Sequence, residues 1–251
     1  MNIAIITGAS AGLGQAFFGS IVRRYPDLEQ IWLIARREER LKAMAQDCPI
    51  PTVAVPLDLT KEESYAALTE KLAHERPTVK IFINNAGMGT LGYIAESDFS
   101  TQTRMVDLNC RGLTAVATAV VPYMPRGAFM VNVASIAAFS PNARLGVYAA
   151  TKAYVLNFSR VLRLELREKG INVLAVCPGP MRTEFLDVAG ITGQSATFER
   201  LPYCDPARVA DTAVRKAAAG RAVYTPRLFF KFYRLVAKLL PQGLVMQWAK
   251  A

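Results

Sequence analysis

The sequence has few residues of the kinds that bind metals or form disulfide bonds. Its 251 residues include one histidine, His74, and four widely separated cysteines, Cys48, Cys110, Cys177 and Cys204. A zinc site needs cysteines or histidines at close, regular spacing, and a disulfide framework is typical of short secreted chains rich in cysteine. Neither pattern is present. We therefore expect no metal centre, and four buried or inert thiols in a reducing compartment.

Long apolar runs are also missing. The longest uncharged stretches, 112–125 and 127–143, are interrupted by Pro122, Asn132 and Pro141, whereas a membrane-spanning helix needs about 20 mostly apolar residues. The chain begins with a strand-like run rather than with basic residues followed by an apolar segment, so we predict no targeting peptide. We expect a cytoplasmic protein that reaches a membrane surface at most.

Acidic residues are scarce in the last part of the chain. Residues 206–251 contain nine Lys or Arg side chains and one acidic residue, Asp211, whereas residues 1–205 contain 21 basic and 19 acidic residues. The formal charge of +10 would suggest nucleic-acid binding if it were spread over the body. Because the body is nearly neutral and no sheet face interleaves aromatic with basic residues, we expect no nucleic-acid partner.

Apolar residues make up 52% of the chain, and they form short runs that alternate with longer helical segments. Strands buried on both faces read as continuous apolar runs. We predict strands at 3–7, 31–35, 52–57, 80–84, 129–134, 172–177 and 222–224, and helices near 13–24, 37–47, 61–75, 101–123, 148–169 and 206–219. This alternation predicts an α/β fold with a doubly wound parallel sheet of about seven strands, the single-domain Rossmann arrangement.

The predicted domain boundary lies where the alternation of strands and helices ends. We place the catalytic domain at 1–226 and a C-terminal amphipathic helical extension at 227–251. Residues 181–205 mix glycines and prolines with large apolar residues, and long insertions after a strand end are usually functional. We therefore interpret 181–205 as a substrate lid.

Glycines follow the first predicted strand, in Thr7-Gly8-Ala9-Ser10-Ala11-Gly12-Leu13-Gly14. Glycines let the backbone approach a pyrophosphate, and the N-terminus of the following helix offers free N–H groups. The spacing of Gly8, Gly12 and Gly14 differs from the usual G-x-G-x-x-G, so a tight turn without a ligand is the alternative. The position directly after the first strand favours dinucleotide binding.

The second predicted strand ends in Ala35-Arg36-Arg37. In this fold an acidic residue at that point accepts from the ribose 2′-hydroxyl, and an Arg accommodates a 2′-phosphate. Arg36, with the Ser10 hydroxyl nearby, therefore favours NADP over NAD; an Arg at a solvated helix start is the alternative. Asp58, at the end of the third strand, is a candidate for the adenine amino group. Its alternative is an N-cap role before 61–75, for which Thr60 is the better candidate.

Tyr148 and Lys152 lie four residues apart in a predicted helix, so they share one face. A tyrosine with a pKa near about 10 is a poor acid–base group at neutral pH, and a nearby ammonium lowers that pKa. Ser135 ends the preceding strand, where its hydroxyl can reach the same pocket. Each residue alone has an ordinary alternative, as a surface pair or a turn cap, but together with the glycines they indicate one site.

With these motifs the chain resembles the short-chain dehydrogenase/reductase family over at least residues 2–225. The matching elements, in family order and spacing, are Thr7–Gly14, Asp58, Asn84-Asn85-Ala86-Gly87, Asn109, Ser135, Tyr148, Lys152 and Pro178-Gly179. The resemblance implies that Tyr148 is the general acid or base, Ser135 polarises the carbonyl, Lys152 binds the nicotinamide ribose, and Asn109 holds a water in the proton relay. It also implies a homodimer or homotetramer, paired through the helices around 101–123 and 148–169.

The resemblance further implies a nicotinamide cofactor, for which we expect NADP (NADPH) rather than NAD. The residue before the middle glycine, Ala11, lacks the basic side chain of some NADP-dependent relatives. The expected cofactor-binding residues are Gly8, Ser10, Gly12, Leu13, Gly14, Arg36, Asp58, Asn85, Ala86, Gly87, Tyr148, Lys152, Pro178, Gly179 and Thr183.

The candidate substrate walls are almost entirely apolar. They consist of Met88, Ile136, Ala137, Leu145, Met181, Phe185, Leu186 and Phe198. Arg144 and Arg182 are near in sequence, but no cluster of cations is present to hold a carboxylate, so an apolar ketone, aldehyde or secondary alcohol is the expected substrate. The alternative is that several of these residues only pack the lid.

Residues 227–240 predict a basic amphipathic helix. At 100° per residue, Arg227, Lys231, Arg234 and Lys238 fall within an arc of roughly 60°, and the other side chains are apolar or Tyr. Such a helix can make a peripheral membrane contact. It can equally pack on the body, cover the substrate pocket or form a subunit interface.

Two functions of different class compete. The first is an NADP(H)-dependent oxidoreductase that transfers a hydride between the nicotinamide and the apolar carbonyl compound or alcohol. The second is an NAD(P)-binding sensor of the same fold without turnover. The presence of Asn109, Ser135, Tyr148 and Lys152 together favours the enzyme, because a sensor does not need the whole set.

Overall fold

The computed structural model describes residues 1–191, 193, 195 and 199–248. Its centre is a seven-stranded sheet in the order β3-β2-β1-β4-β5-β6-β7, in which every neighbouring pair is parallel. The strands are β1 (Asn2–Thr7), β2 (Gln30–Ala35), β3 (Thr52–Pro56), β4 (Thr78–Asn84), β5 (Phe129–Val133), β6 (Asn172–Val176) and β7 (Val223–Tyr224). The predicted α/β Rossmann fold is confirmed.

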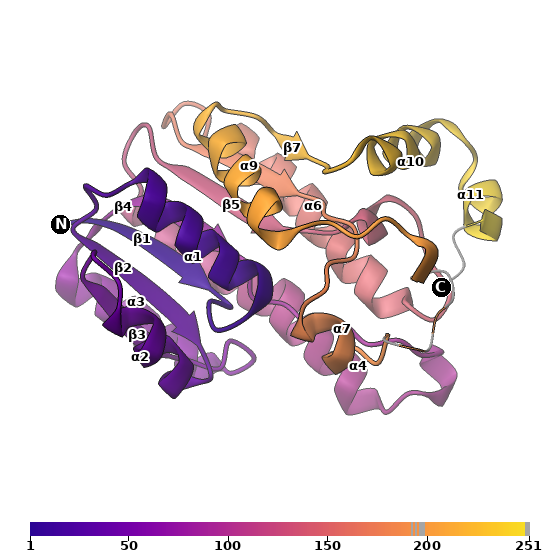
Figure 1. Cartoon of the computed structure of the whole chain (residues 1–251), viewed down its shortest axis with the longest axis horizontal. Coiled ribbons are helices and arrows are strands. Elements are labelled where there is room, and N and C mark those ends of the chain that lie inside the picture. The colour runs from indigo at the N-terminus through magenta and orange to yellow at the C-terminus, as the bar shows by residue number, and fades with distance from the viewer. Residues whose placement is uncertain (192, 194, 196–198, 249–251) are drawn as a thin grey trace.

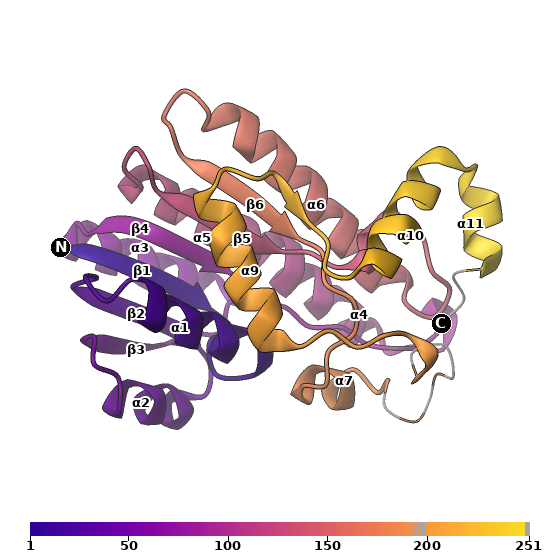
Figure 2. The same ribbon diagram turned by 45° about the horizontal axis from the view of Figure 1, so that its top comes forward.

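Helices cover both faces of this sheet, and α7, α10 and α11 lie beyond its end (Figures 1 and 2). The helices of the described residues are α1 (Gly12–Arg24), α2 (Glu38–Gln46), α3 (Glu62–Glu75), α4 (Phe99–Val106), α5 (Leu113–Val120), α6 (Gly146–Glu165), α7 (Glu184–Val188), α9 (Pro206–Ala218), α10 (Leu228–Leu239) and α11 (Gln242–Trp248). Alternate strand residues point to opposite faces. Ile6 accordingly packs in one core layer with Phe17 of α1 and Val214 of α9, and Ile5 packs in the other with Leu72 of α3.

The strand order reverses at β1, which lies between β2 and β4. In open α/β sheets the crevice at such a reversal, beyond the carboxyl ends of the strands, is where ligands bind. A hydrogen-bonded cross-link fixes the two loops there: the backbone N–H of Asn85 donates to Thr7 Oγ1 at 2.9 Å, and Asn85 Nδ2 donates to the Thr7 carbonyl at 3.0 Å. The fold therefore joins the glycine turn rigidly to the loop after β4.

The helix predicted over 101–123 is interrupted. α4 and α5 are separated by a π-helical turn, Asp107–Gly112, and a short 3₁₀ turn, Val121–Tyr123, follows α5. π-Turns insert one residue into a helix and often occur at functional sites. Here Gly112 lies so close to the Leu59 carbonyl that an added Cβ would be 2.4 Å from the oxygen. The absence of a side chain at 112 therefore permits this close contact at the π-turn that contains Asn109.

The C-terminal extension forms α10 and α11 at one end of the molecule, beyond β7 (Figures 1 and 2). Phe230 of α10 is fully buried, and its ring occupies the space beside Gly179, where an added Cβ would come within 2.2 Å of a ring carbon. The helix thus packs on the body by a narrow face. Within the described part of the chain, no helix has both the length and the apolar character needed to cross a membrane.

Candidate active site

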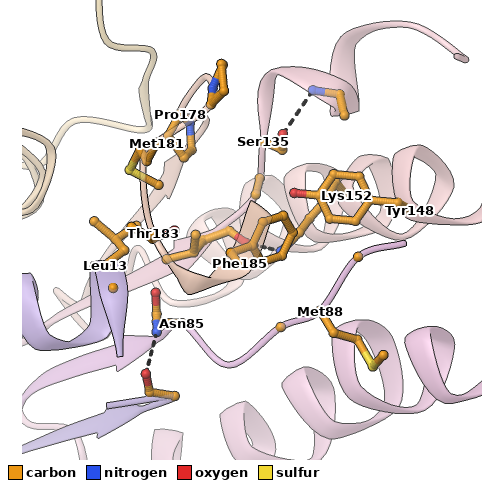
Figure 3. A pocket seen from close by; sticks show the side chains of 18 of the residues that line it. Leu13, Asn85, Met88, Ser135, Tyr148, Lys152, Pro178, Met181, Thr183 and Phe185 are labelled. Atoms are coloured by element: carbon orange, nitrogen blue, oxygen red, sulfur yellow. Dashed lines mark hydrogen bonds between the residues drawn. The ribbon is translucent and has the colours of Figure 1, made fainter. Parts of the chain in front are cut away.

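A cavity of about 780 Å³ lies at the carboxyl ends of the strands. Its walls contain every residue predicted to bind the cofactor except Gly14, and they contain three of the four predicted catalytic residues, Ser135, Tyr148 and Lys152. Figure 3 shows Leu13 and Asn85 on one side of this space and Tyr148 and Lys152 on the other. Gly14 and the fully buried Asn109 lie behind the walls.

The glycine turn has the geometry of a dinucleotide cradle. Gly8 has a φ of +63°, a conformation that favours glycine. An added Cβ at Gly14 would lie 2.1 Å from the Gly8 carbonyl oxygen, so only glycine lets the start of α1 approach the turn. Gly14 therefore shapes the site without lining it. This arrangement fits a bound pyrophosphate, because the backbone itself forms the wall next to the helix N-terminus.

Arg36, Arg37 and Glu184 line the end of the cavity beyond β2, and Arg40 lies behind them. Arg36 lines the wall as predicted, and Arg37 lies beside it with both Nε and an Nη atom donating to Ser10 Oγ at 3.3 Å. Arg37 also pairs with Glu184 at 2.9 Å, and Arg40 pairs with the same carboxylate at 2.6 Å. No local sequence pattern predicts a role for Arg37, Arg40 or Glu184, apart from the position of Arg37 directly after Arg36.

Asp58 also lines this end of the cavity. Its Oδ1 accepts hydrogen bonds from the Thr60 N–H at 3.1 Å and the Thr60 hydroxyl at 2.8 Å. Burial raises the pKa of this carboxyl, but the hydrogen bonds from Thr60 and the charges of Arg36 and Arg104 outweigh it, so the pKa lies below its usual value. The N-cap of α3 is Lys61, without a side-chain bond. Neither Asp58 nor Thr60 caps that helix, which corrects the alternative considered for this pair.

Tyr148 and Ser135 meet at the other end of the cavity (Figure 3). Burial raises the pKa of Tyr148 to about 12, and a hydrogen bond with Ser135 opposes this rise. The Ser135 oxygen accepts from the Ala137 N–H at 3.1 Å, which leaves the hydroxyl proton available for another acceptor. The Phe185 ring lies 5.8 Å from the Tyr148 ring, measured between centroids. The phenol is therefore protonated at neutral pH in an aromatic, half-buried setting.

Lys152 lies beneath Tyr148 and is 4% exposed. Its Nζ donates to the Val133 carbonyl at 2.8 Å and lies 5.7 Å from the centre of the Tyr148 ring. Burial lowers the pKa of Lys152 to about 8. The sequence led us to expect that Lys152 lowers the pKa of Tyr148. The structure instead has the pKa of Tyr148 raised, because burial dominates.

The side-chain amide of Asn109 forms hydrogen bonds with Met88 and Thr151. Its Oδ1 accepts from the Met88 N–H at 2.9 Å, and its Nδ2 donates to the Met88 carbonyl at 2.8 Å and to Thr151 Oγ1 at 3.0 Å. These contacts fix the loop after β4 to α6, the helix that carries Tyr148 and Lys152. They are the contacts of a positioning residue. The role of Asn109 in a proton relay stays a prediction.

The substrate end of the cavity is apolar. The predicted residues Met88, Ile136, Ala137, Leu145, Met181, Phe185 and Leu186 all line it; Phe198 lies outside the described residues. Arg182 does not contribute, because its guanidinium lies over the Tyr203 ring at 5.2 Å. The extension adds a further wall that the sequence analysis left as one of several alternatives, made of Phe229, Phe230, Phe232, Tyr233, Val236 and Val245.

Fold and site together define a Rossmann protein with a dinucleotide cradle beside a Ser–Tyr–Lys group. Residues 2–190 match the family model of the short chain dehydrogenases. The chain is 32% identical over 219 residues to "Sulfoacetaldehyde reductase 2" of Chromohalobacter salexigens, which covers 84% of this chain and 85% of the relative. This protein belongs to the short-chain dehydrogenase/reductase family, a family of oxidoreductases.

Solved structures agree with this assignment. A short-chain dehydrogenase from Sphingobium yanoikuyae in complex with NADPH is 31% identical, with a TM-score of 0.80 over 97% of this chain and 94% of that one. The bulky-bulky ketone specific alcohol dehydrogenase from Comamonas testosteroni is 27% identical, with a TM-score of 0.73 over 97% of this chain and 96% of that one. More distant structures of this fold contain NAD or NADP.

Proposed function

We propose that the protein is an NADP(H)-dependent oxidoreductase that interconverts an apolar ketone or aldehyde and the corresponding alcohol. The observation that carries this proposal is that Tyr148, Ser135 and Lys152 line the apolar half of a cavity whose other half is a dinucleotide cradle. The cavity would then hold a hydride donor and a proton donor together.

The chain's own residues supply the proton and the polarisation. The chemistry that a bound reduced nicotinamide would supply is the hydride for the new C–H bond at the carbonyl carbon. Tyr148 donates its phenolic proton to the carbonyl oxygen, and the O–H of Ser135 donates a hydrogen bond to the same oxygen. Lys152 would bind the nicotinamide ribose and, as an ammonium, favour the phenolate left on Tyr148. In the oxidising direction the phenolate takes the proton back.

The preference for NADP rests on the arginines beyond β2. Arg36 and Arg37 line this end of the cavity, and Arg37 is positioned on Ser10. Two guanidinium groups and a hydroxyl suit a 2′-phosphate better than a free ribose hydroxyl. The NADPH complex of the Sphingobium yanoikuyae relative supports this assignment.

The test is the substitution Tyr148→Phe, with NADPH oxidation followed across ketones, aldehydes, 3-ketoacyl thioesters and ketosteroids. Loss of a general acid costs between about 10² and 10⁴ in rate, so we expect turnover to fall by that factor while NADPH binding stays within about twofold. Tyr154→Phe is the matched control, because Tyr154 lies on the same helix and its hydroxyl pairs with Thr114 at 2.7 Å. Full activity of Tyr148→Phe would overturn the mechanism. Wild-type protein that binds NADPH and reduces no carbonyl in the panel would favour the sensor.

We also propose a homodimer or homotetramer paired through α4, α5 and α6. Apolar side chains on α6 support this, because Val161 is 53% and Leu164 is 69% exposed. Exposed apolar patches on a protein surface often mark interfaces with other chains. Light scattering of Leu164→Glu should show a smaller assembly than wild type. An unchanged mass would exclude this face.

A further inference from the structure

The outward face of α10 is apolar and uncovered. Leu228, Phe232, Leu235 and Leu239 recur at helical spacing, so they form one stripe along the helix. They are 80%, 66%, 52% and 69% exposed, respectively. The buried Phe230 lies on the opposite side of the helix. The sequence left open whether the apolar face of this helix packs on the body, and the structure shows that only a narrow part of it does.

Cations accompany this stripe and acids do not. Lys231 and Lys238 are exposed and flank the stripe on one side. Within the described residues of α10 and α11 there is no Asp or Glu. The segment that continues into α11 adds three partly exposed apolar side chains, Leu240, Leu244 and Met246. We name the set Leu228, Phe232, Leu235, Leu239, Leu240, Leu244 and Met246, with Lys231 and Lys238, the outer face.

We propose that the outer face docks on the surface of an anionic lipid bilayer. An amphipathic helix with a strong apolar face and flanking cations lies in the interface plane, with the apolar side chains among the acyl chains and the cations near the headgroups. The helix is too short and too charged to span the bilayer. Docking would bury the exposed stripe and place Lys231 and Lys238 beside lipid phosphates.

A second copy of the chain fits this surface less well. A two-fold contact places the same patch of each copy against the other. The flanking lysines of the two copies would then gather at one interface without an acidic partner from either outer face, and like charges brought together there are unfavourable. Charge complementarity therefore favours an anionic lipid surface.

The cavity lies next to the outer face. Phe232 belongs to both, because it is part of the stripe and also lines the cavity, where it is joined by Phe229, Val236 and Val245. This step rests on the proposed function: an apolar carbonyl compound dissolved in the bilayer would enter the cavity past Phe232 without crossing water. The membrane would then be the source of the substrate.

The test uses the full chain with vesicles of phosphatidylcholine, with and without about one third phosphatidylglycerol. We expect sedimentation with the anionic vesicles, weakened by high salt because surface charge is screened. The double substitution Leu235→Ser/Leu239→Ser should reduce binding at least tenfold. Lys231→Gln and Lys238→Gln should each reduce it about fivefold, the effect of one surface cation. Ile94→Ser, in the loop after β4, where the side chain is 63% exposed and outside both the cavity and the helices of the proposed subunit interface, is the matched control and should bind like wild type.

The outcomes separate docking from catalysis. Leu235 and Leu239 do not line the cavity, so their variants should reduce a water-soluble ketone at the wild-type rate and lose only vesicle binding. Absence of wild-type binding to anionic vesicles, or equal binding by the double variant, overturns the proposal. If wild type does not bind vesicles and the double variant has a different assembly mass from wild type in light scattering, the outer face is an interface between copies and docking on a bilayer is excluded.

Discussion

The buried ammonium of Lys152 should cost the folded protein stability at neutral pH. The side chain is 4% exposed, and its Nζ donates a hydrogen bond to the Val133 carbonyl at 2.8 Å. Burial lowers its pKa from the ordinary 10.5 to about 8. This difference corresponds to about 3 kcal/mol by which the folded state disfavours the charged lysine.

The cost depends on pH in a defined direction. Below pH 8 the lysine is protonated in both states, so the whole cost is present. Between about pH 8 and 10.5 the unfolded chain still holds a proton that the folded protein has released, so the free energy of unfolding rises with pH. The pKa of Tyr148 is raised from 10.0 to about 12, so its ionisation lowers the free energy of unfolding from about pH 10 upward, an effect that wild type and a Lys152 variant share. Between pH 7 and pH 10 we expect a gain of about 2.5 kcal/mol from Lys152.

Urea unfolding of wild type and Lys152→Met, without cofactor, measures this gain. The wild-type free energy of unfolding minus that of the variant should increase by about 2.5 kcal/mol from pH 7 to pH 10. The lost bond to Val133 and the altered packing contribute equally at both pH values and cancel. Lys169→Met, at an exposed lysine, should show a change below about 0.5 kcal/mol. A pH-independent difference for Lys152→Met would refute a burial cost at this site.

Two further substitutions test the ends of the cavity. Arg37→Ala should lower the preference for NADPH over NADH, measured as the ratio of kcat/KM values, by between about 10-fold and 100-fold, because it removes a charge-assisted bond worth about 1.5–3 kcal/mol. Arg40 pairs with Glu184 but does not line the cavity, so Arg40→Ala should leave the ratio within about twofold. Equal effects of the two substitutions would contradict the assignment of Arg37. Phe230→Ala should release α10 from the body, because burial of one phenylalanine side chain contributes about 3 kcal/mol. Trypsin should then cut within 227–238 while the rest of the protein stays intact. Continued protection of α10 from trypsin would show that other contacts hold the helix.

Much of the fold could be predicted because the sheet is buried on both faces. Strands in such a sheet are short apolar runs, and the predicted ends fall within two residues of those observed in β1 to β7. The glycine turn was predictable for a related reason. A positive φ at Gly8 and the close approach of Gly14 leave almost no alternative residue, so the physical requirement is visible in the sequence itself.

The parts that were missed depend on residues far apart in the chain. Glu184 of α7 meets Arg37 across 147 positions, and no local sequence pattern predicts a pair so far apart in the chain. The break in the helix predicted over 101–123 has the same origin. Its apolar periodicity continues through the π-turn, and the contacts of Gly112 with Leu59 and of Asn109 with Met88 exist only in the folded chain.

The apolar periodicity of the C-terminal extension predicts an amphipathic helix but not which part of its apolar face packs on the body. Periodicity places the four cations of 227–240 on one arc and leaves the rest of the helix surface apolar. Gly179 determines which part of that apolar surface packs on the body, because a glycine leaves room for the Phe230 ring. The resemblance implied a cofactor role for Gly179, and this residue lines the cavity as well. One glycine therefore joins the loop after β6 to α10, so a change in the docking of α10 would reach the cofactor and substrate walls together.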